Sequence, residues 1–321
     1  MNYGARVVGS VGDRMKTLQI FLLGQPRIVV TDPASPITCT RSVLALFAFL
    51  LLHPRRAIPR EQIMDIFWGE HAEAQARSCL NSALWRLRNT LDHANCPAQE
   101  YLLSTEDGRV GFNWRSTYWL DVERFEQLSA LLNIAPTALT PADAQQLETA
   151  CRHYAGELLE GYYDDWALRE RERLRRLYVS GLAHLMHYHM HQADLESALT
   201  FGRKILDLDP LREEIHRTLM RLYLKLGQRA KAIAQYEECR TLIADELGAE
   251  PMEETQLLYA EMLGLTATAT GAGVPLPNLR DYQQTLRELK LAHKRIDEAR
   301  VQIRRSIQLL EHCVEQIEMP R

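Results

Sequence analysis

The chain has 321 residues, of which 46% are hydrophobic and 25% are charged, and this composition excludes wholesale disorder and collagen-like repetition. A chain of this length is expected to form two or three domains. The net charge is −4, but residues 1–116 hold 13 basic and 10 acidic side chains, a net of +3, and the remainder holds 25 and 32, a net of −7. The N-terminal part is thus mildly basic and the remainder is acidic, which is a first hint that the N-terminal part binds a polyanion.

The spacing of the cysteines and the hydropathy of the chain indicate the cellular compartment. The six cysteines include no CxxC pair, which favours reduced thiols over disulfides or a metal site. The longest apolar run, Val43–Leu52, is half the length of a membrane span and fits a buried helix. No segment has the layout of a signal peptide, and residues 1–16 are expected to be a flexible N-terminus. We therefore expect a cytoplasmic protein with no membrane partner.

Local patterns predict strands followed by helices at the front of the chain. Apolar runs at Leu18–Leu23 and Arg27–Val30 flank Gly24-Gln25-Pro26 and predict an antiparallel hairpin. The next predicted elements are a strand at Ile37–Thr40, a helix capped by Thr40 or Ser42 that runs through Leu52, and a helix at Arg60–Trp68.

The third predicted helix, Glu73–His93, is the most informative element. Its leucines at 80, 84, 87 and 91 repeat in steps of four, three and four, which places them on one stripe that faces a core. The remaining sides are rich in hydrogen-bond donors and poor in acids, as suits contacts with bases and phosphates. They carry Ser78, Ser82, Trp85, Arg86 and Asn89, with Arg77, Asn81 and Arg88 on the flank.

A second hairpin completes the predicted first domain. Asp107-Gly108 separates the strand-like segments Tyr101–Thr105 and Arg109–Asn113, which is a strong hairpin signal. Strands, three helices and a terminal hairpin are the order of a winged helix-turn-helix, whose third helix enters the major groove of double-stranded DNA. We expect phosphate contacts from Arg77, Arg88 and Arg109, and base or groove contacts from Ser78, Asn81, Ser82, Trp85, Arg86 and Asn89. The alternative is an ordinary solvated helix face.

The middle of the chain is expected to be helical. A helix is predicted at Val122–Leu132, with Asp121 as its N-cap, and another at Pro141–Tyr154. The stretch Ala193–Leu199 aligns with Gly227–Ile233 at an offset of 34, the length of a tetratricopeptide repeat. Such repeats form a curved surface that binds peptides, although these helices could equally pack only against the first domain.

A heptad pattern marks the end of the chain. Residues 265–278 are rich in Thr, Ala, Gly and Pro and are expected to form a linker. Residues 279–318 are predicted to form a coiled-coil oligomerisation helix, or a helix that folds back on its own repeat domain. The oligomerisation residues on this interpretation are Leu286, Leu289, Ile296, Ile303, Ile307, Leu310, Val314 and Ile317.

These features together resemble one known family. The segments Leu18–Gly24, Arg60–Trp68, Ala76–Arg88 and Tyr101–Phe112 resemble the OmpR-type DNA-binding domain of the Streptomyces antibiotic regulatory protein (SARP) family. Tyr154–Gly161, Asp209–Glu213 and Glu246–Gly248 resemble its bacterial transcriptional activator domain. The resemblance implies a transcriptional activator that binds direct repeats near promoters and recruits RNA polymerase. It also implies a winged helix over 17–116 and a tetratricopeptide-like domain over 117–264.

The fold class predicted is therefore mainly α with a small β component. The competing function is a helical-repeat scaffold or sensor whose winged helix binds protein. An enzyme is disfavoured, because the sequence holds no GxxxxGK[ST] or GxSxG motif. His184, His187, His189 and His191 suggest a metal cluster, but without HExxH they more often serve packing. We expect no cofactor, no metal and no catalytic residue.

Overall fold

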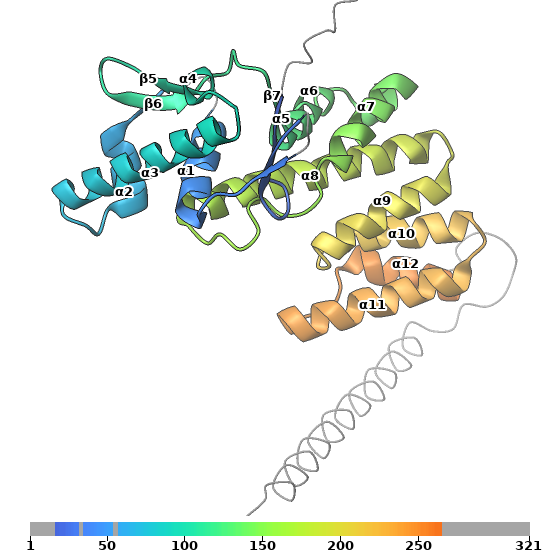
Figure 1. The fold of residues 1–321 in the computed structure, drawn as a ribbon. Helices are drawn as coiled ribbons and strands as arrows, with labels where there is room; N and C mark the ends of the chain where they lie inside the picture. The colour runs from blue at the N-terminus through green and yellow to red at the C-terminus, as the bar shows by residue number, and fades with distance from the viewer. Residues whose placement is uncertain (1–16, 32–34, 54–56, 265–321) are drawn as a thin grey trace, which may run out of the picture. The chain divides into compact units, whose positions relative to one another are not determined.

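The computed structural model describes residues 17–31, 35–53 and 57–264 (Figure 1). All the described residues up to Leu263 belong to one compact unit. The predicted N-terminal segment 1–16, linker 265–278 and oligomerisation helix 279–318 lie outside the described residues and stay predictions. Within the described part, no helix combines the length and the apolar content needed to cross a membrane.

A four-stranded sheet opens the fold. Its strands are β1 (Leu18–Phe21), β2 (Arg27–Val30), β3 (Ser35–Ile37) and β7 (Tyr118–Leu120), in the order β3-β2-β1-β7. The predicted hairpin is confirmed, since β1 and β2 pair antiparallel with Leu18 opposite Val30. The third strand was predicted at Ile37–Thr40 and lies two residues earlier, because Thr40 is needed as the N-cap residue of the next helix. The strand β7 pairs parallel with β1, although about one hundred residues separate them.

Three helices follow the first strands and match the predicted ranges closely. They are α1 (Arg41–Leu51), α2 (Arg60–Trp68) and α3 (Glu73–His93). Every residue of α1 from Val43 to Leu51 is buried, which confirms that the long apolar run is a core helix. Both α2 and α3 pack against one another, and α3 also packs against α1 (Figure 1).

The predicted second hairpin is confirmed and joins a three-stranded sheet. The elements are β4 (Ile58–Pro59), α4 (Ala98–Tyr101), β5 (Leu102–Ser104) and β6 (Arg109–Phe112), with strand order β4-β6-β5. Tyr101 was predicted to begin the strand, but it ends the short helix α4 instead. Gly108 has φ +79° in the turn, a conformation that side chains rarely tolerate. Three helices followed by this β-hairpin, the wing, form a winged helix.

The predicted helix at Val122–Leu132 is interrupted, and Asp121, its expected N-cap residue, binds another part of the chain. The structure has α5 (Asp121–Glu126) and α6 (Leu128–Leu131), separated at Gln127. Asp121 was predicted as the N-cap residue, but that position belongs to Leu120. The Asp121 carboxylate is buried and accepts hydrogen bonds of 2.8 Å from the backbone N–H groups of Leu22 and Leu23. It thus fixes the end of β1, because its acceptors satisfy donors that are buried away from water.

The rest of the described chain is a helical repeat domain. After the 3₁₀ turn Pro136–Ala138, its helices are α7 (Pro141–Arg152), α8 (Asp165–His191), α9 (Leu195–Leu208), α10 (Glu213–Lys225), α11 (Arg229–Leu247) and α12 (Glu253–Leu263). The helix predicted at Pro141–Tyr154 ends two residues earlier, at Arg152. Consecutive helices from α8 to α12 pack against each other (Figure 1).

The 34-residue offset is visible in the backbone as well as in the sequence. Ala193 follows α8 with φ +57°, and Gly227 follows α10 with φ +70°. The aligned small residues Ala198 and Ala232 are completely buried in the helices that come next. Equivalent turns and equivalent close contacts recur in the two units, so the predicted tetratricopeptide-like repeat is confirmed.

Backbone contacts join the winged helix to the repeat domain. The N–H of Gly24 donates to the carbonyl of Glu157 at 2.8 Å, and that of Leu159 donates to the carbonyl of Leu22 at 2.8 Å. A Cβ on Gly156 would lie 2.9 Å from the Cα of Gly24, so this approach requires glycine. The two halves are therefore joined through main-chain atoms as well as through the shared strand β7.

Arginine side chains reinforce the same junction. Arg171 of α8 donates hydrogen bonds of 2.8–2.9 Å to the carbonyl oxygens of Leu158, Leu159 and Tyr162. Arg41 of α1 donates to the carbonyl of Gly161, and its guanidinium lies over the Tyr162 ring. The loop between α7 and α8 is thus held by one arginine from each half of the protein.

Candidate nucleic-acid interface

The rotational setting of α3 matches the sequence prediction. The leucines at 80, 84, 87 and 91 are buried, with at most 1% of each exposed. Trp85 lies on the other side of the helix, and 62% of its surface is exposed. Its indole is therefore accessible for contact with a partner.

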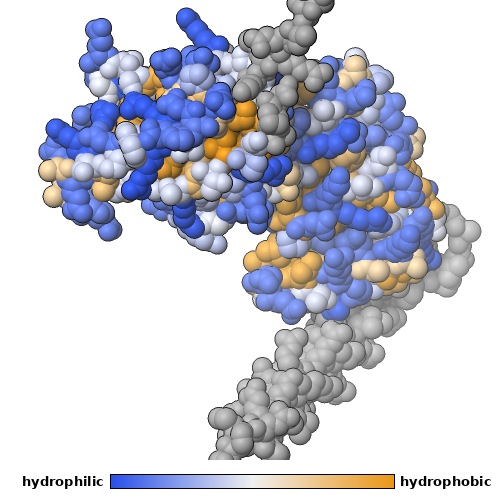
Figure 2. Space-filling view, viewed as in Figure 1, coloured by the Kyte–Doolittle hydropathy of each residue, from blue (hydrophilic) through white to orange (hydrophobic). Residues whose placement is uncertain are grey.

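The polar residues predicted for DNA contact lie on the accessible sides of α3. Arg77, Ser78, Asn81, Ser82 and Arg86 are exposed, and Arg88 and Asn89 are half-buried. Figure 2 shows hydrophilic side chains over most of the visible surface of α3. Arg109 is also exposed, on the wing. The structure therefore leaves all nine predicted residues at least partly accessible, although their contacts with DNA stay a prediction.

Two of the predicted phosphate-binding arginines carry acidic partners on their own elements. Arg77 lies 2.6 Å from Glu73, one helical turn earlier on α3. Arg109 lies 2.8 Å from Asp107 in the wing turn. Hydrogen bonds from Thr105 and from Arg109 hold the pKa of the Asp107 carboxyl below its usual value. Both pairs are well exposed, so they cost little to separate when a phosphate approaches.

Two further arginines connect the elements of this surface. Arg88 of α3 donates to the hydroxyl oxygen of Ser104 in β5 at 3.0 Å. Arg60, the first residue of α2, donates to the amide oxygen of Asn81. Arg86 has neither a hydrogen bond nor an ion pair within the described residues. Consequently Arg60 links α2 to α3, and Arg88 links α3 to the wing. Arg86 is available to bind a ligand.

Sequence reasoning missed Arg60. Its aliphatic chain passes close to Gly108, since a Cβ on that glycine would lie 3.8 Å from Arg60 Cδ. Arg60 therefore sits between the wing turn and α3, and it adds a cation to the predicted surface. The strand β4, which comes just before α2, pairs with β6, and this pairing places the start of α2 beside the wing. The one local signal was a basic residue at the start of a predicted helix, where acids are normally favoured.

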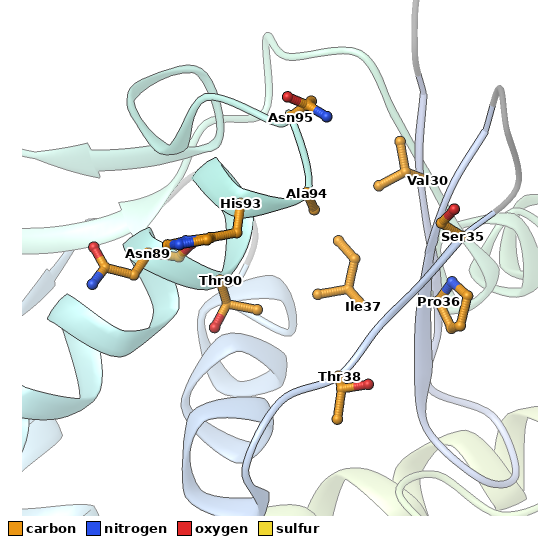
Figure 3. A pocket seen from close by; sticks show the side chains of 10 residues that line it. All are labelled: Val30, Ser35, Pro36, Ile37, Thr38, Asn89, Thr90, His93, Ala94 and Asn95. Atoms are coloured by element: carbon orange, nitrogen blue, oxygen red, sulfur yellow. The ribbon is translucent and has the colours of Figure 1, made fainter.

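A cavity of about 610 Å³ lies at the C-terminal end of α3 (Figure 3). Thr90 of α3 and Ile37 lie on opposite sides of it, and the His93 ring and the Asn89 amide are directed away from Ile37. The ring of His93 is held by its Nδ1 at 2.6 Å from the carbonyl oxygen of Asn89. No residue lining this cavity carries a permanent charge, so it adds no phosphate-binding group to the surface of α3.

The histidines of α8 do not form a cluster with the arrangement of a metal site. His184 contacts the carbonyl oxygen of Leu132 at 3.1 Å, and His189 contacts Asp194 at 3.0 Å. Burial is the main factor that lowers the pKa of His187, and His184 and His191 lower it further. No group of three or more His, Cys, Asp or Glu residues in the described ranges is arranged to hold a metal ion.

Two family models match the chain. Residues 34–110 match the model "Transcriptional regulatory protein, C terminal", and residues 120–263 match the "Bacterial transcriptional activator domain". The first match covers α1 to the wing with its exposed α3, and the second covers the repeat domain. The chain thus joins a winged helix of the type found in transcriptional regulatory proteins to a helical bacterial transcriptional activator domain.

Several regulatory proteins are similar in sequence to this chain. Regulatory protein AfsR of Streptomyces coelicolor is 29% identical over 220 residues, which are 68% of this chain and 22% of AfsR. Transcriptional regulatory protein MoaR1 of Mycobacterium tuberculosis is 24% identical, over 68% of this chain and 71% of MoaR1. The chain belongs to the SARP family of transcriptional regulators. It spans about a fifth of the length of AfsR.

A solved structure supports the same fold. The structure of Mycobacterium tuberculosis EmbR in complex with a low-affinity phosphopeptide matches with a TM-score of 0.63. The match covers 87% of this chain and 71% of the EmbR chain, at 19% sequence identity. This likeness confirms the predicted architecture of a winged helix followed by helical repeats.

Proposed function

We propose that this protein binds specific sequences in double-stranded DNA through α3 and the wing, and that it activates transcription. One observation carries the proposal. On α3, an exposed tryptophan lies among arginine, serine and asparagine side chains, while the leucines on the other side form the core. A helix with this division can enter the major groove without losing its packing.

The proposed contacts divide by chemistry. Phosphates are bound by Arg77, Arg88 and Arg109, because guanidinium groups bind phosphate oxygens with paired hydrogen bonds. Arg60 joins this group on the strength of its place beside the wing. The bases or the groove are contacted by Ser78, Asn81, Ser82, Trp85, Arg86 and Asn89.

Family membership supports the finer parts of the proposal. SARP regulators bind direct repeats near promoters, and we propose the same target here, with recruitment of RNA polymerase by the bound protein. The 34-residue repeat offers a curved helical surface of the kind that binds other proteins. The alternative, in which the winged helix itself binds protein, gains no support from the acid-poor surface of α3.

A mobility-shift assay tests DNA binding. The probe is the DNA upstream of the protein's own gene cluster, with a scrambled duplex of equal length as the control. We expect a shift at low salt and a logarithm of the binding constant that falls linearly with the logarithm of the salt concentration. No shift with any upstream fragment, or binding without a salt slope, would contradict the proposal and favour the protein-binding alternative.

We further propose that the chain is a homo-oligomer. The predicted heptad residues are Leu286, Leu289, Ile296, Ile303, Ile307, Leu310, Val314 and Ile317. Joining two DNA-binding domains in one particle raises the affinity for paired half-sites. Light scattering should give a multiple of the chain mass for the full protein and one chain mass for a version that ends at Leu265. If the full protein has the mass of a single chain, or if both versions contain the same number of chains, this proposal is contradicted.

A further inference from the structure

The last turns of α8 and α10 occupy equivalent places in the two repeat units. The two helices run in the same direction, and α9 packs against both of them (Figure 1). The offset of 34 residues relates α8 to α10, and burial follows this offset. The equivalent pairs Leu185 and Leu219, Met186 and Met220, and Tyr188 and Leu222 are all buried. Both helices therefore turn equivalent faces toward the core and equivalent faces toward water.

The exposed faces of the two helices repeat one pattern of side chains. Each presents a basic, an apolar and a basic residue at positions i, i+3 and i+4, which places the three on one side of the helix. These residues are His187, Met190 and His191 on α8, and Arg221, Leu224 and Lys225 on α10. The four basic side chains are exposed, and the two apolar ones are half-buried. We call these six residues the basic strip.

No acidic residue neutralises the basic strip. None of its four basic side chains forms a hydrogen bond or an ion pair within the described residues. Residues 173–193 and 215–236, which contain the two helix ends, hold no Asp or Glu, although acidic side chains outnumber basic ones over residues 117–321. The charges of Arg221 and Lys225 are therefore available to an anionic partner.

The histidines give the α8 half of the strip a different character. Burial is the main factor that lowers the pKa of His187, and the neighbouring His184 and His191 lower it further. A histidine with a lowered pKa is neutral at pH 7 and offers one ring N–H as a donor. The α10 half thus supplies positive charge, and the α8 half supplies hydrogen-bond donors to the same kind of partner.

The apolar residues of the strip select between anionic partners. The side chains of Met190 and Leu224 lie among the basic ones and are half exposed to water. A nucleic-acid backbone presents phosphates and sugars, which leave such side chains without an apolar contact. A peptide can place carboxylates on the cations and an apolar side chain between them, and it then covers the apolar surface as well.

We propose that the basic strip binds a peptide segment of another protein in which Asp or Glu residues are interspersed with apolar ones. Its carboxylates bind Arg221 and Lys225, and its apolar side chains contact Met190 and Leu224. Equivalent faces of successive repeats form one surface, so a single segment can contact both units. This inference rests on the proposed role of the repeat domain as a protein-binding surface, and it names the chemistry of the partner.

Selection from a random-peptide phage library on the immobilised full chain tests the chemistry of the partner. We expect the enriched peptides to contain an excess of Asp and Glu together with apolar residues. In fluorescence anisotropy, the most enriched peptide should bind at least about tenfold more tightly than a version with Asn and Gln in place of Asp and Glu. Enrichment without an acidic excess, no enrichment, or equal affinities for the two peptides would overturn the proposal.

Two matched double variants locate the site. Arg221→Gln with Lys225→Gln removes both charges of the strip and should weaken binding of the selected peptide about tenfold. Arg169→Gln with Lys204→Gln removes two exposed charges elsewhere on the same domain, and it should change the affinity by less than about twofold. Equal losses in the two double variants would overturn the placement.

Charge reversal guards against a loss that comes from misfolding. The variant Arg221→Glu with Lys225→Glu should lose the acidic peptide and gain a version in which Lys replaces Asp and Glu, since the charges are again complementary. Failure to bind either peptide would overturn a role for these two charges in recognition.

A mobility-shift assay separates this inference from DNA binding. The Arg221→Gln, Lys225→Gln variant should shift the duplex like the unmodified protein. If it loses affinity for DNA and keeps its affinity for the peptide, the strip is a DNA contact and the inference is overturned. Loss of peptide binding by the unmodified chain with an intact DNA shift would overturn this inference and leave the proposed DNA binding in place.

Discussion

Polar groups at the junction of the two halves are shielded from water, whereas those on α3 and the wing are exposed. At the junction, the Asp121 carboxylate and the Arg171 guanidinium are shielded from water and bind backbone groups of buried residues. On α3 and the wing, the pairs Glu73–Arg77 and Asp107–Arg109 are exposed and neighbouring in sequence. The junction groups stabilise one arrangement of the chain. The surface pairs can be exchanged for DNA phosphates at small cost, because water already competes with them.

The largest effect is expected at the junction. Asp121→Ala leaves the N–H groups of Leu22, Leu23 and Val122 without their acceptor in a buried site. We expect the free energy of unfolding, measured by urea denaturation, to fall by about 3 kcal/mol. The control Asp164→Ala removes an exposed aspartate that makes no capping hydrogen bond on α8. It should cost less than about 0.5 kcal/mol, and a similar loss in both variants would contradict the role of Asp121.

The next effect separates the two sides of α3. Trp85→Ala should weaken binding to a specific duplex about tenfold, since an apolar contact in the groove is lost. It should leave the unfolding midpoint unchanged, because the side chain is exposed. Leu84→Ala on the buried side should instead lower the free energy of unfolding by about 3 kcal/mol. If Trp85→Ala destabilises the fold as much as Leu84→Ala, the tryptophan is a packing residue.

These two regions also differ in how far the sequence predicts them. Both α2 and α3 were predicted with their observed bounds, and Trp85 was placed correctly, because helical periodicity is a local property of the sequence. The burial of Leu80 and its partner leucines followed from the same periodicity. The sequence therefore predicts which side of α3 is available for contact.

The junction depends on contacts between distant residues, and local patterns do not contain them. Asp121 was expected to cap its own helix, but it binds the end of a strand about one hundred residues earlier. This contact depends on the parallel pairing of β7 with β1, and a local hairpin motif cannot predict a parallel pairing. The contact of Arg60 with Asn81 was missed for the same reason, since it depends on the position of α2 beside α3.

A smaller effect is expected in the salt dependence of DNA binding. Arg77→Ala and Arg88→Ala should each reduce the slope of log K against log salt by about 0.9, the value for one phosphate contact. Arg152→Ala is the matched control, because Arg152 on α7 also pairs with a glutamate one turn earlier. Its slope should equal that of the unmodified protein. Equal slopes for all three variants would show that these α3 arginines do not contact phosphates.

The smallest effect tests whether the exposed pairs restrain binding. Glu73→Gln frees Arg77 from its partner and should raise the affinity for the duplex about twofold to threefold. Removing any negative charge near DNA can raise affinity, so a double-mutant cycle is needed to isolate the pair. In the Arg77→Ala background, Glu73→Gln should then have almost no effect on the dissociation constant. If its effect is the same in both backgrounds, Glu73 acts on DNA directly, and Arg77 is not held back by its partner. Glu148→Gln, which breaks the equivalent pair on α7, controls for changes in overall charge and should leave the affinity unchanged.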